Sequence, residues 1–173
     1  MFPRMVHGMR VLPSYRIFAL NDPTCDDLDN LHESGEEAIA TKGVGWSANA
    51  VAVSTVLDLF ALPVVLEVWP SFPPASLSED RADLVEESTL EIPGGSLAVG
   101  EALEERDRLG VDLPDGGGTY GVRVVGTGRR KVKDLLERLG SQSAELREIE
   151  TYRIQLWQLS TEPRWDDQDD EGE

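Results

Sequence analysis

Residues 84–99 read LVEESTLEIPGGSLAV, and this stretch indicates the fold most directly. Within 88–92, small or apolar residues on one face alternate with polar residues on the other. A period of two residues is typical of a β-strand with one buried face. The Pro-Gly-Gly sequence at 93–95 is a turn signal, and 96–99 supply a second short apolar run. The stretch therefore predicts a β-hairpin.

Other runs of β-branched and aromatic residues, bounded by turn-forming residues, predict further strands. Two of these runs, 44–56 and 64–69, look like a second hairpin. Residues 22–43 are acidic and weakly patterned, so we expect a loop there, with at most a short helical turn near 28–32. Residues 101–109 fit either a short helix or an exposed loop. The remaining strand runs are 15–20, 119–125 and 152–159.

One segment has a helical period. Val132, Leu135, Leu136 and Leu139 share one helix face, and Gly140 follows as a stop signal. Because strands outnumber helices, we expect an all-β protein, an antiparallel β-sandwich of about seven to eight strands with one or two short helices. The expected core is made of residues from the strands: Ile17, Phe18, Leu20, Val53, Leu66, Val68, Leu90, Ile92, Leu97, Val99, Tyr120, Val122, Val124, Ile154 and Leu156.

The length of 173 residues fits one domain with tails. We expect a flexible N-terminal arm at 1–13, a β-sandwich domain at 14–161 and a disordered acidic tail at 162–173. The arm lacks the apolar segment of a signal peptide. The tail is acidic and poor in apolar residues, a composition that does not support a packed core. No apolar run is long enough to form a membrane-spanning helix.

The charge is strongly acidic, with 33 Asp and Glu against 16 Lys and Arg, for a net charge of -17. Such a surface repels nucleic acid and anionic membranes, because both need clustered basic residues to bind. It favours a basic protein partner, such as a nuclease or a toxin. The alternative is an acidic surface that serves only solubility.

The residues that carry most enzyme chemistry are scarce. The one cysteine, Cys25, allows no internal disulfide and fits a reducing, cytoplasmic location. His7 and His32 have no second ligand at metal-binding spacing, so we expect no metal and no cofactor. The acidic pairs Glu86-Glu87 and Glu104-Glu105 leave open a carboxylate-pair hydrolase. We expect a non-enzymatic binding protein instead.

Aromatic residues leave a further alternative open, a small-ligand or carbohydrate-binding β-sandwich. Trp46, Trp69 and Phe72 would supply its stacking surfaces. The test of this alternative is whether the three rings line one concave site or fill the core.

Two segments supply the candidate binding residues. Arg129-Arg130-Lys131 is the one dense basic cluster, suited to holding a phosphate or a carboxylate. The tail places a tryptophan, a residue type enriched at binding hot spots, beside a run of acids. We expect the tail to dock on a basic surface, either on a partner or on this chain's own basic cluster. The candidates are Trp165, Asp166, Asp167, Asp169, Asp170, Arg129 and Arg130.

Four stretches together resemble a known family: 15–22 (YRIFALND), 87–100 (ESTLEIPGGSLAVG), 114–126 (PDGGGTYGVRVVG) and 152–159 (YRIQLWQL). Their order is similar to that of the competence protein J-like family of small β-sandwich proteins, whose namesake is a nuclease inhibitor. Their strand and turn patterns are also similar to those of immunity proteins of bacterial toxin systems. The resemblance implies inhibition by binding and transfers no functional residue. The chain departs from it at 129–150, which looks like an insertion, and in the tail.

Overall fold

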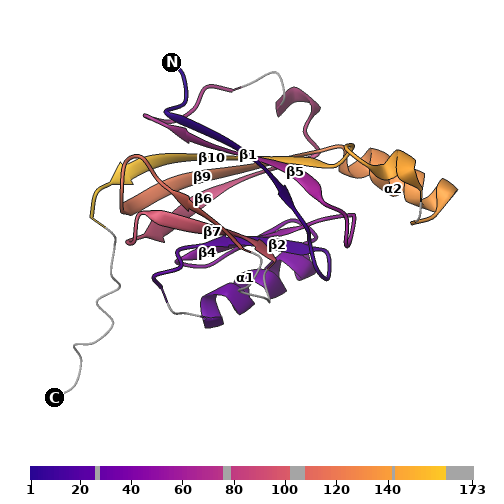
Figure 1. Cartoon of the computed structure of the whole chain (residues 1–173), viewed down its shortest axis with the longest axis horizontal. Coiled ribbons are helices and arrows are strands. Elements are labelled where there is room, and N and C mark those ends of the chain that lie inside the picture. Colours follow the sequence, from indigo (N-terminus) through magenta and orange to yellow (C-terminus); the bar gives the residue numbers. More distant parts are fainter. Residues whose placement is uncertain (26–27, 76–78, 102–107, 142, 163–173) are drawn as a thin grey trace.

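The computed structural model describes residues 1–25, 28–75, 79–101, 108–141 and 143–162. Two five-stranded β-sheets dominate it and do not close into a barrel (Figure 1). The first sheet, sheet A, has the strand order β1 (Met5–Val11), β5 (Leu62–Trp69), β10 (Thr151–Ser160), β9 (Gly118–Thr127) and β6 (Leu84–Ile92). The second, sheet B, has the order β3 (Val44–Trp46), β4 (Ala50–Ser54), β2 (Ile17–Asn21), β7 (Ser96–Glu101) and β8 (Leu109–Asp112).

Apolar side chains from both sheets form one buried cluster between them. Every residue of the expected core is buried, which confirms that part of the prediction. Ile17 is the one that lies elsewhere, in a second cluster on the other face of sheet B. Strand β9 is buried along nearly its whole length, since Trp157 of β10 covers Gly121 on its outer face, and Phe72 and Glu79 contact Arg123 there.

The all-β expectation holds in its coarse form, but two details were wrong. The described chain has ten strands, more than expected. Sheet A is mixed, because β5 and β10 run parallel with Ile154 opposite Leu66. The strands beyond the expected number are β1, β3 and β8, which lie at sheet edges, and β3 and β8 are short. Such strands have few buried apolar residues, so their sequence pattern is weak.

The hairpin predicted at 84–99 does not form. Strand β6 pairs with β9 in sheet A, whereas β7 pairs with β2 and β8 in sheet B. The buried carboxylate of Asp22, at the end of β2, accepts a hydrogen bond of 2.7 Å from the backbone N–H of Gly94. The turn is therefore tied to sheet B, and the two alternating strands face each other across the core instead of lying side by side.

The hairpin predicted between 44–56 and 64–69 does not form either. Strands β3 and β4 form a hairpin with each other, with Val44 opposite Val53. Strand β5 then crosses to sheet A, where it pairs with β1 and β10. The run 44–56 reads as one strand because both halves are apolar, although the turn lies in its middle.

The N-terminal segment differs from the expected flexible arm. Residues 5–11 form β1, an edge strand antiparallel to β5. Strand β8 was not predicted either, and 102–107, part of the segment left open, lie outside the described residues.

Helix α1 (Leu28–Thr41) replaces most of the loop expected at 22–43. It covers the outer face of sheet B (Figure 1). Its buried face carries Leu31 and Ala38, which meet small residues of the strands, including Ala50 and Ala52. Weak apolar patterning hid the helix, because alanines and a buried Ser34 make up much of this contact.

Helix α2 (Arg129–Leu139) contains the predicted helix and begins three residues earlier, so the basic cluster lies in its first turn. It projects from one end of the two sheets (Figure 1). Short 3-10 turns occur at Glu79–Arg81 and Ala144–Leu146. In the part of the chain described, no helix is long and apolar enough to cross a membrane.

Tyr120 gives a prediction about alkaline stability. Burial, and secondly the negative charge of Asp115, raise the pKa of Tyr120 to about 12. An unfolded tyrosine titrates near pH 10, so above that pH the unfolded chain loses a proton that the folded chain keeps. Stability therefore falls as the pH rises from about 10 to about 12. Urea midpoints measured across this range should fall less steeply in Tyr120→Phe than in the wild type. Parallel curves for the two proteins would contradict the assignment.

Candidate functional site

The outer face of sheet A carries a row of polar side chains across four neighbouring strands. Glu67 of β5 lies opposite Gln155 of β10, which lies opposite Arg123 of β9, which lies opposite Glu87 of β6. The side chains of Glu67, Gln155 and Arg123 are buried. We call these four residues, together with Glu79 from the loop above them, the Arg123 network.

The network is connected by hydrogen bonds. Arg123 donates through Nε to Glu87, and through Nη1 to Glu79 Oε1 at 3.0 Å and Gln155 Oε1 at 3.3 Å. Gln155 Nε2 donates in turn to Glu67 Oε2 at 2.9 Å. A buried guanidinium without such partners would be strongly destabilising, so the two carboxylates compensate its charge.

An aromatic group lies on this network. The ring of Phe72 stands 4.7 Å from the guanidinium carbon of Arg123 and meets the edge of Trp157 at 5.1 Å between centroids. Gly121 makes room for Trp157, because a Cβ there would lie 2.2 Å from the indole atom Cε2. Trp69 donates from Nε1 to Glu67 Oε2 at 2.9 Å.

The patch is partly open to solvent. Phe72 is 54% exposed, whereas Arg123 beneath it is 4% exposed. The side chain of Glu87 is 43% exposed at the rim. Of these groups the ring of Phe72 is the apolar one that a partner could contact, and phenylalanine is enriched at protein interfaces. Arg123 is fixed on strand β9 of the sheet, whereas Phe72 belongs to the loop after β5 and is positioned by its contacts with Arg123 and Trp157.

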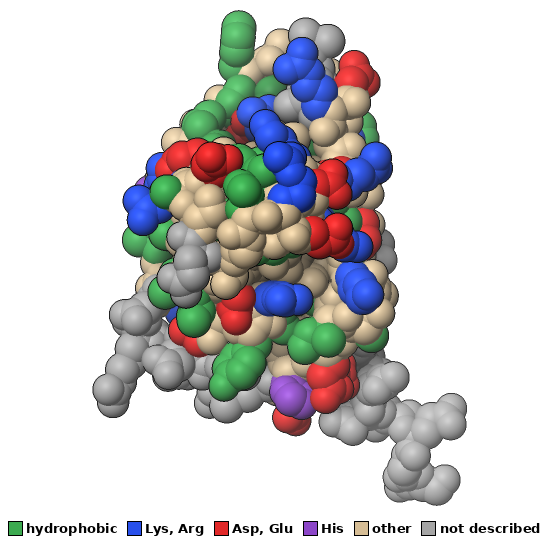
Figure 2. All heavy atoms as spheres, turned by 90° about the vertical axis from the view of Figure 1, so that its right-hand side faces the viewer, with side chains coloured by type: hydrophobic (Ala, Val, Ile, Leu, Met, Phe, Trp, Pro, Cys, Tyr) green, Lys and Arg blue, Asp and Glu red, His purple; other side chains and the backbone are tan. Residues whose placement is uncertain are grey.

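The predicted binding residues Arg129 and Arg130 lie elsewhere, at the start of α2. They line a groove of about 530 Å³ together with Arg16, Lys42 and Lys133, and we call these five residues the basic groove. Figure 2 looks onto the end of the molecule that carries α2, where Lys and Arg side chains gather.

Arg129 forms the floor of the basic groove. Its guanidinium donates to the carbonyl oxygens of Ser54 and Lys42, and to the hydroxyl of Tyr152 at 2.7 Å. Tyr152 donates to the buried carboxylate of Glu150 at 2.6 Å. Burial, followed by the charge of Glu150, raises the pKa of Tyr152 well above its ordinary value. The tyrosine therefore stays neutral and links the arginine to the carboxylate.

Three residues at the rim of the groove have strained backbones. Tyr15, Arg16 and Lys42 have φ angles of 54°, 59° and 54°, in the left-handed region that favours glycine. Such conformations cost roughly 1–3 kcal/mol each and gather at functional sites. Tyr15 and Arg16 form the two-residue turn that joins β1 to β2.

The other predicted site residues fall in the tail. Trp165, Asp166, Asp167, Asp169 and Asp170 lie outside the described residues. The described chain ends at Glu162, whose carbonyl accepts from Thr119 at the opposite end of β9 from α2 (Figure 1). The structure therefore does not bring the start of the tail near Arg129 or Arg130.

The positions of Trp46, Trp69 and Phe72 do not favour the alternative of a small-ligand or carbohydrate-binding β-sandwich. Trp46 is in sheet B and packs against the core. Trp69 and Phe72 lie at the outer face of sheet A. The three rings therefore do not line one ligand site.

The carboxylate pairs do not converge either. Arg123 binds Glu87, whereas Glu86 points to the other side of β6, toward Gly43. Glu104 and Glu105 lie outside the described residues. Among the described residues, no group of three His, Cys, Asp or Glu side chains could hold a metal ion.

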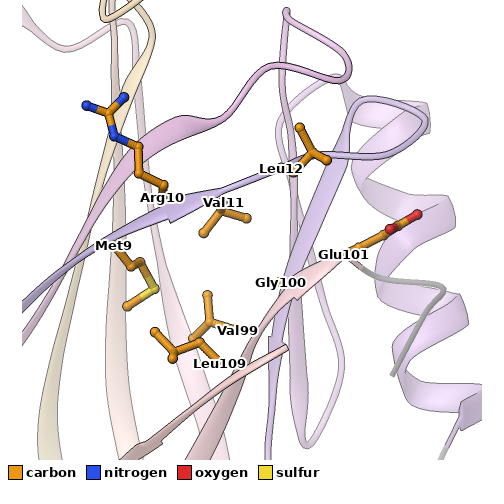
Figure 3. Close-up of a pocket in the computed structure, with 8 residues that line it drawn as sticks. All are labelled: Met9, Arg10, Val11, Leu12, Val99, Gly100, Glu101 and Leu109. Carbon is orange, nitrogen blue, oxygen red and sulfur yellow. The ribbon is translucent and has the colours of Figure 1, made fainter. Parts of the chain in front are cut away.

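A second, smaller pocket of about 140 Å³ opens between the edges of the two sheets. Met9, Val11, Val99 and Leu109 converge on it, whereas Arg10 points away (Figure 3). Its volume is below the range of about 300–1,000 Å³ that is usual for ligand pockets.

The Arg123 network was not predicted from the sequence. One signal was present: Arg123 and Gly121 interrupt an otherwise apolar strand, and glycine inside a strand often marks a close approach. Phe72 had no such signal. It belongs to a proline-rich loop, and the sequence of a loop does not show which strand the loop will pack against.

No protein-family model matches this sequence, and no curated protein matches it significantly. Two solved structures share its fold. ComJ from Bacillus subtilis, described as an inhibitor of the DNA degrading activity of NucA, matches with a TM-score of 0.57 and 15% identity, over 92% of this chain and 99% of that chain. A chain described as crocagin biosynthetic gene J matches with a TM-score of 0.57 and 19% identity, over 90% and 99% of the two chains. The expected resemblance to the competence protein J-like fold is confirmed.

Proposed function

We propose that this protein is a non-enzymatic inhibitor that binds a basic protein partner, a nuclease or a nuclease-like toxin. The observation that carries the proposal is the half-exposed ring of Phe72, in the loop after β5, over the buried Arg123 of strand β9, in a chain with net charge -17. The fold shared with ComJ supports the inhibitory role.

Charge and anchoring have separate parts in this binding. The negative field of the whole molecule attracts a basic partner and raises the rate of association, an effect that salt weakens. The aromatic patch supplies contact area that excludes water once the complex has formed. Association should therefore depend strongly on salt, and dissociation on Phe72.

The test begins with capture of partners from the source organism at low and high salt. A captured nuclease is then assayed for DNA degradation with and without this protein. Inhibition is the expected result. If no nuclease is captured at low salt, or a captured nuclease degrades DNA equally fast with this protein present, the proposal is wrong.

Phe72→Ala should weaken the captured complex by about 10- to 100-fold, mainly through faster dissociation, because hot-spot truncations cost about 2 kcal/mol or more. Stability should change little, since the ring is half exposed. Surface plasmon resonance measures both rate constants, and a thermal melt checks the fold.

Leu59→Ala provides the matched control, because Leu59 is also an exposed apolar residue, at 69%, but lies away from the patch in the loop between β4 and β5. It should bind like the wild type. Equal losses in both variants would show that the Phe72 patch is not the docking surface.

A further inference from the structure

The basic groove is an exception within an acidic molecule. Among the residues that the structure describes, none of its five cations forms an ion pair with a carboxylate. Four other arginines do pair: Arg4 with Asp115, Arg10 with Glu148, Arg123 with Glu79 and Glu87, and Arg153 with Glu67. In a chain with two acids for every base, uncompensated cations in one groove indicate a site kept for an external anion.

The position of the groove adds to its positive potential. The first turn of α2 carries Arg129 and Arg130 and no acidic residue, although the positive end of a helix dipole favours acids there. Asp83 is the one carboxylate that lines the groove in the described chain, and its Oδ2 accepts from the backbone N–H of Arg130 at 2.8 Å. The buried Glu150 lies behind Arg129, to which Tyr152 links it, so five cations face two carboxylates and the site keeps a net positive charge.

The groove also has an apolar wall. Tyr15 and Ile39 are 73% and 56% exposed, and Leu136 lines the groove from α2. The volume of about 530 Å³ matches a ligand of nucleotide size. A long polyanion would extend beyond the groove over an acidic surface, whereas a small anion stays within a Debye length of about 8 Å of the cations.

We propose that the basic groove binds a small organic phosphate that carries an aromatic or other planar apolar group. Arg130 and Lys133, three residues apart on one face of α2, bind the phosphate, and Tyr15 stacks on the planar group. Arg129 shapes the floor, because its guanidinium is already held by three oxygen atoms. This site is separate from the Phe72 patch and does not depend on the proposed inhibition.

The test uses adenosine monophosphate, adenosine and inorganic phosphate as probes in calorimetric titrations at low and high salt. We expect the monophosphate to bind most tightly, inorganic phosphate more weakly and adenosine very weakly, with binding reduced by salt. The double variant R130Q/K133Q should bind the monophosphate at least about tenfold more weakly, because it loses charge-assisted contacts.

The variant K131Q/R138Q is the control, because it removes the same charge from exposed positions of the same helix outside the groove. It should lose clearly less affinity than R130Q/K133Q, since Lys131 and Arg138 lie outside the groove and make no direct contact with the anion. Equal losses in both variants, equal binding of adenosine and the monophosphate, or no binding of the monophosphate would each overturn the proposal. Tighter binding of a synthetic peptide with the sequence of 162–173 would also overturn it, because the occupant would then be an acidic segment.

Discussion

Gly45→Ala should destabilise the protein by at least about 3 kcal/mol, because a Cβ at this position has no room. It would lie 1.7 Å from the carbonyl oxygen of Ser34 and 2.7 Å from the backbone nitrogen of Ala38, both in α1. Backbone atoms cannot rotate away as a side chain can, so the helix must move off sheet B. The melting temperature should fall by roughly 6–12 °C.

Gly35→Ala is the control on the facing helix. A Cβ there meets no atom within 4 Å, and Gly35 lies inside α1. Replacing it should raise stability by roughly 0.5–1 kcal/mol, because glycine is a poor helix former. Chemical denaturation of both variants measures the difference. A Gly45→Ala protein as stable as the wild type would show that α1 does not pack this closely on β3.

Local patterns predicted the buried residues better than the strand partners. Leu90, Ile92, Leu97 and Val99 are buried as the alternation indicates. The same alternation fits a hairpin or two strands in facing sheets, since both bury the same side chains. Asp22 decides between them from more than seventy residues away, and no local pattern contains that contact.

The missed elements had weaker local signals for physical reasons. In β1, Met5, His7, Met9 and Val11 alternate with the more exposed Val6, Gly8 and Arg10, but a single neighbouring strand leaves this edge only partly buried. In α1 the contact with the sheet is made largely by alanine and serine, which carry little hydrophobic contrast. Both elements owe their structure to tertiary packing more than to their own sequence.

The residues of the basic groove also fall into two groups: those that a local sequence pattern predicted and those that only the fold brings together. Arg129 and Arg130 stood out in the sequence as a dense basic cluster, and they do line a groove. Arg16 and Lys42 join them only because the ends of β2 and α1 meet there. A cluster that lies together in space but not along the chain requires the fold to be known first.

Glu150→Ala should cost about 3–5 kcal/mol, because it leaves several buried polar groups without partners. The carboxylate of Glu150 is fully buried and accepts from the backbone N–H groups of Val56 at 2.7 Å and Leu57 at 2.9 Å. It also accepts from Tyr152, which holds Arg129 at the floor of the basic groove. Its removal would release the loop after β4 and the groove together.

Glu150→Gln separates lost hydrogen bonding from lost volume. The amide keeps one acceptor oxygen but turns an NH₂ group toward a backbone N–H, so the variant should fall between Glu150→Ala and the wild type. Glu148→Gln is the neighbouring control. The Glu148 carboxylate pairs with Arg10 at the exposed surface, and this contact lowers the pKa of Glu148. Exposed pairs contribute little to stability, so this variant should unfold at nearly the wild-type urea midpoint. If all three variants unfold at the same midpoint, the buried carboxylate is not what fixes the loop and the groove floor.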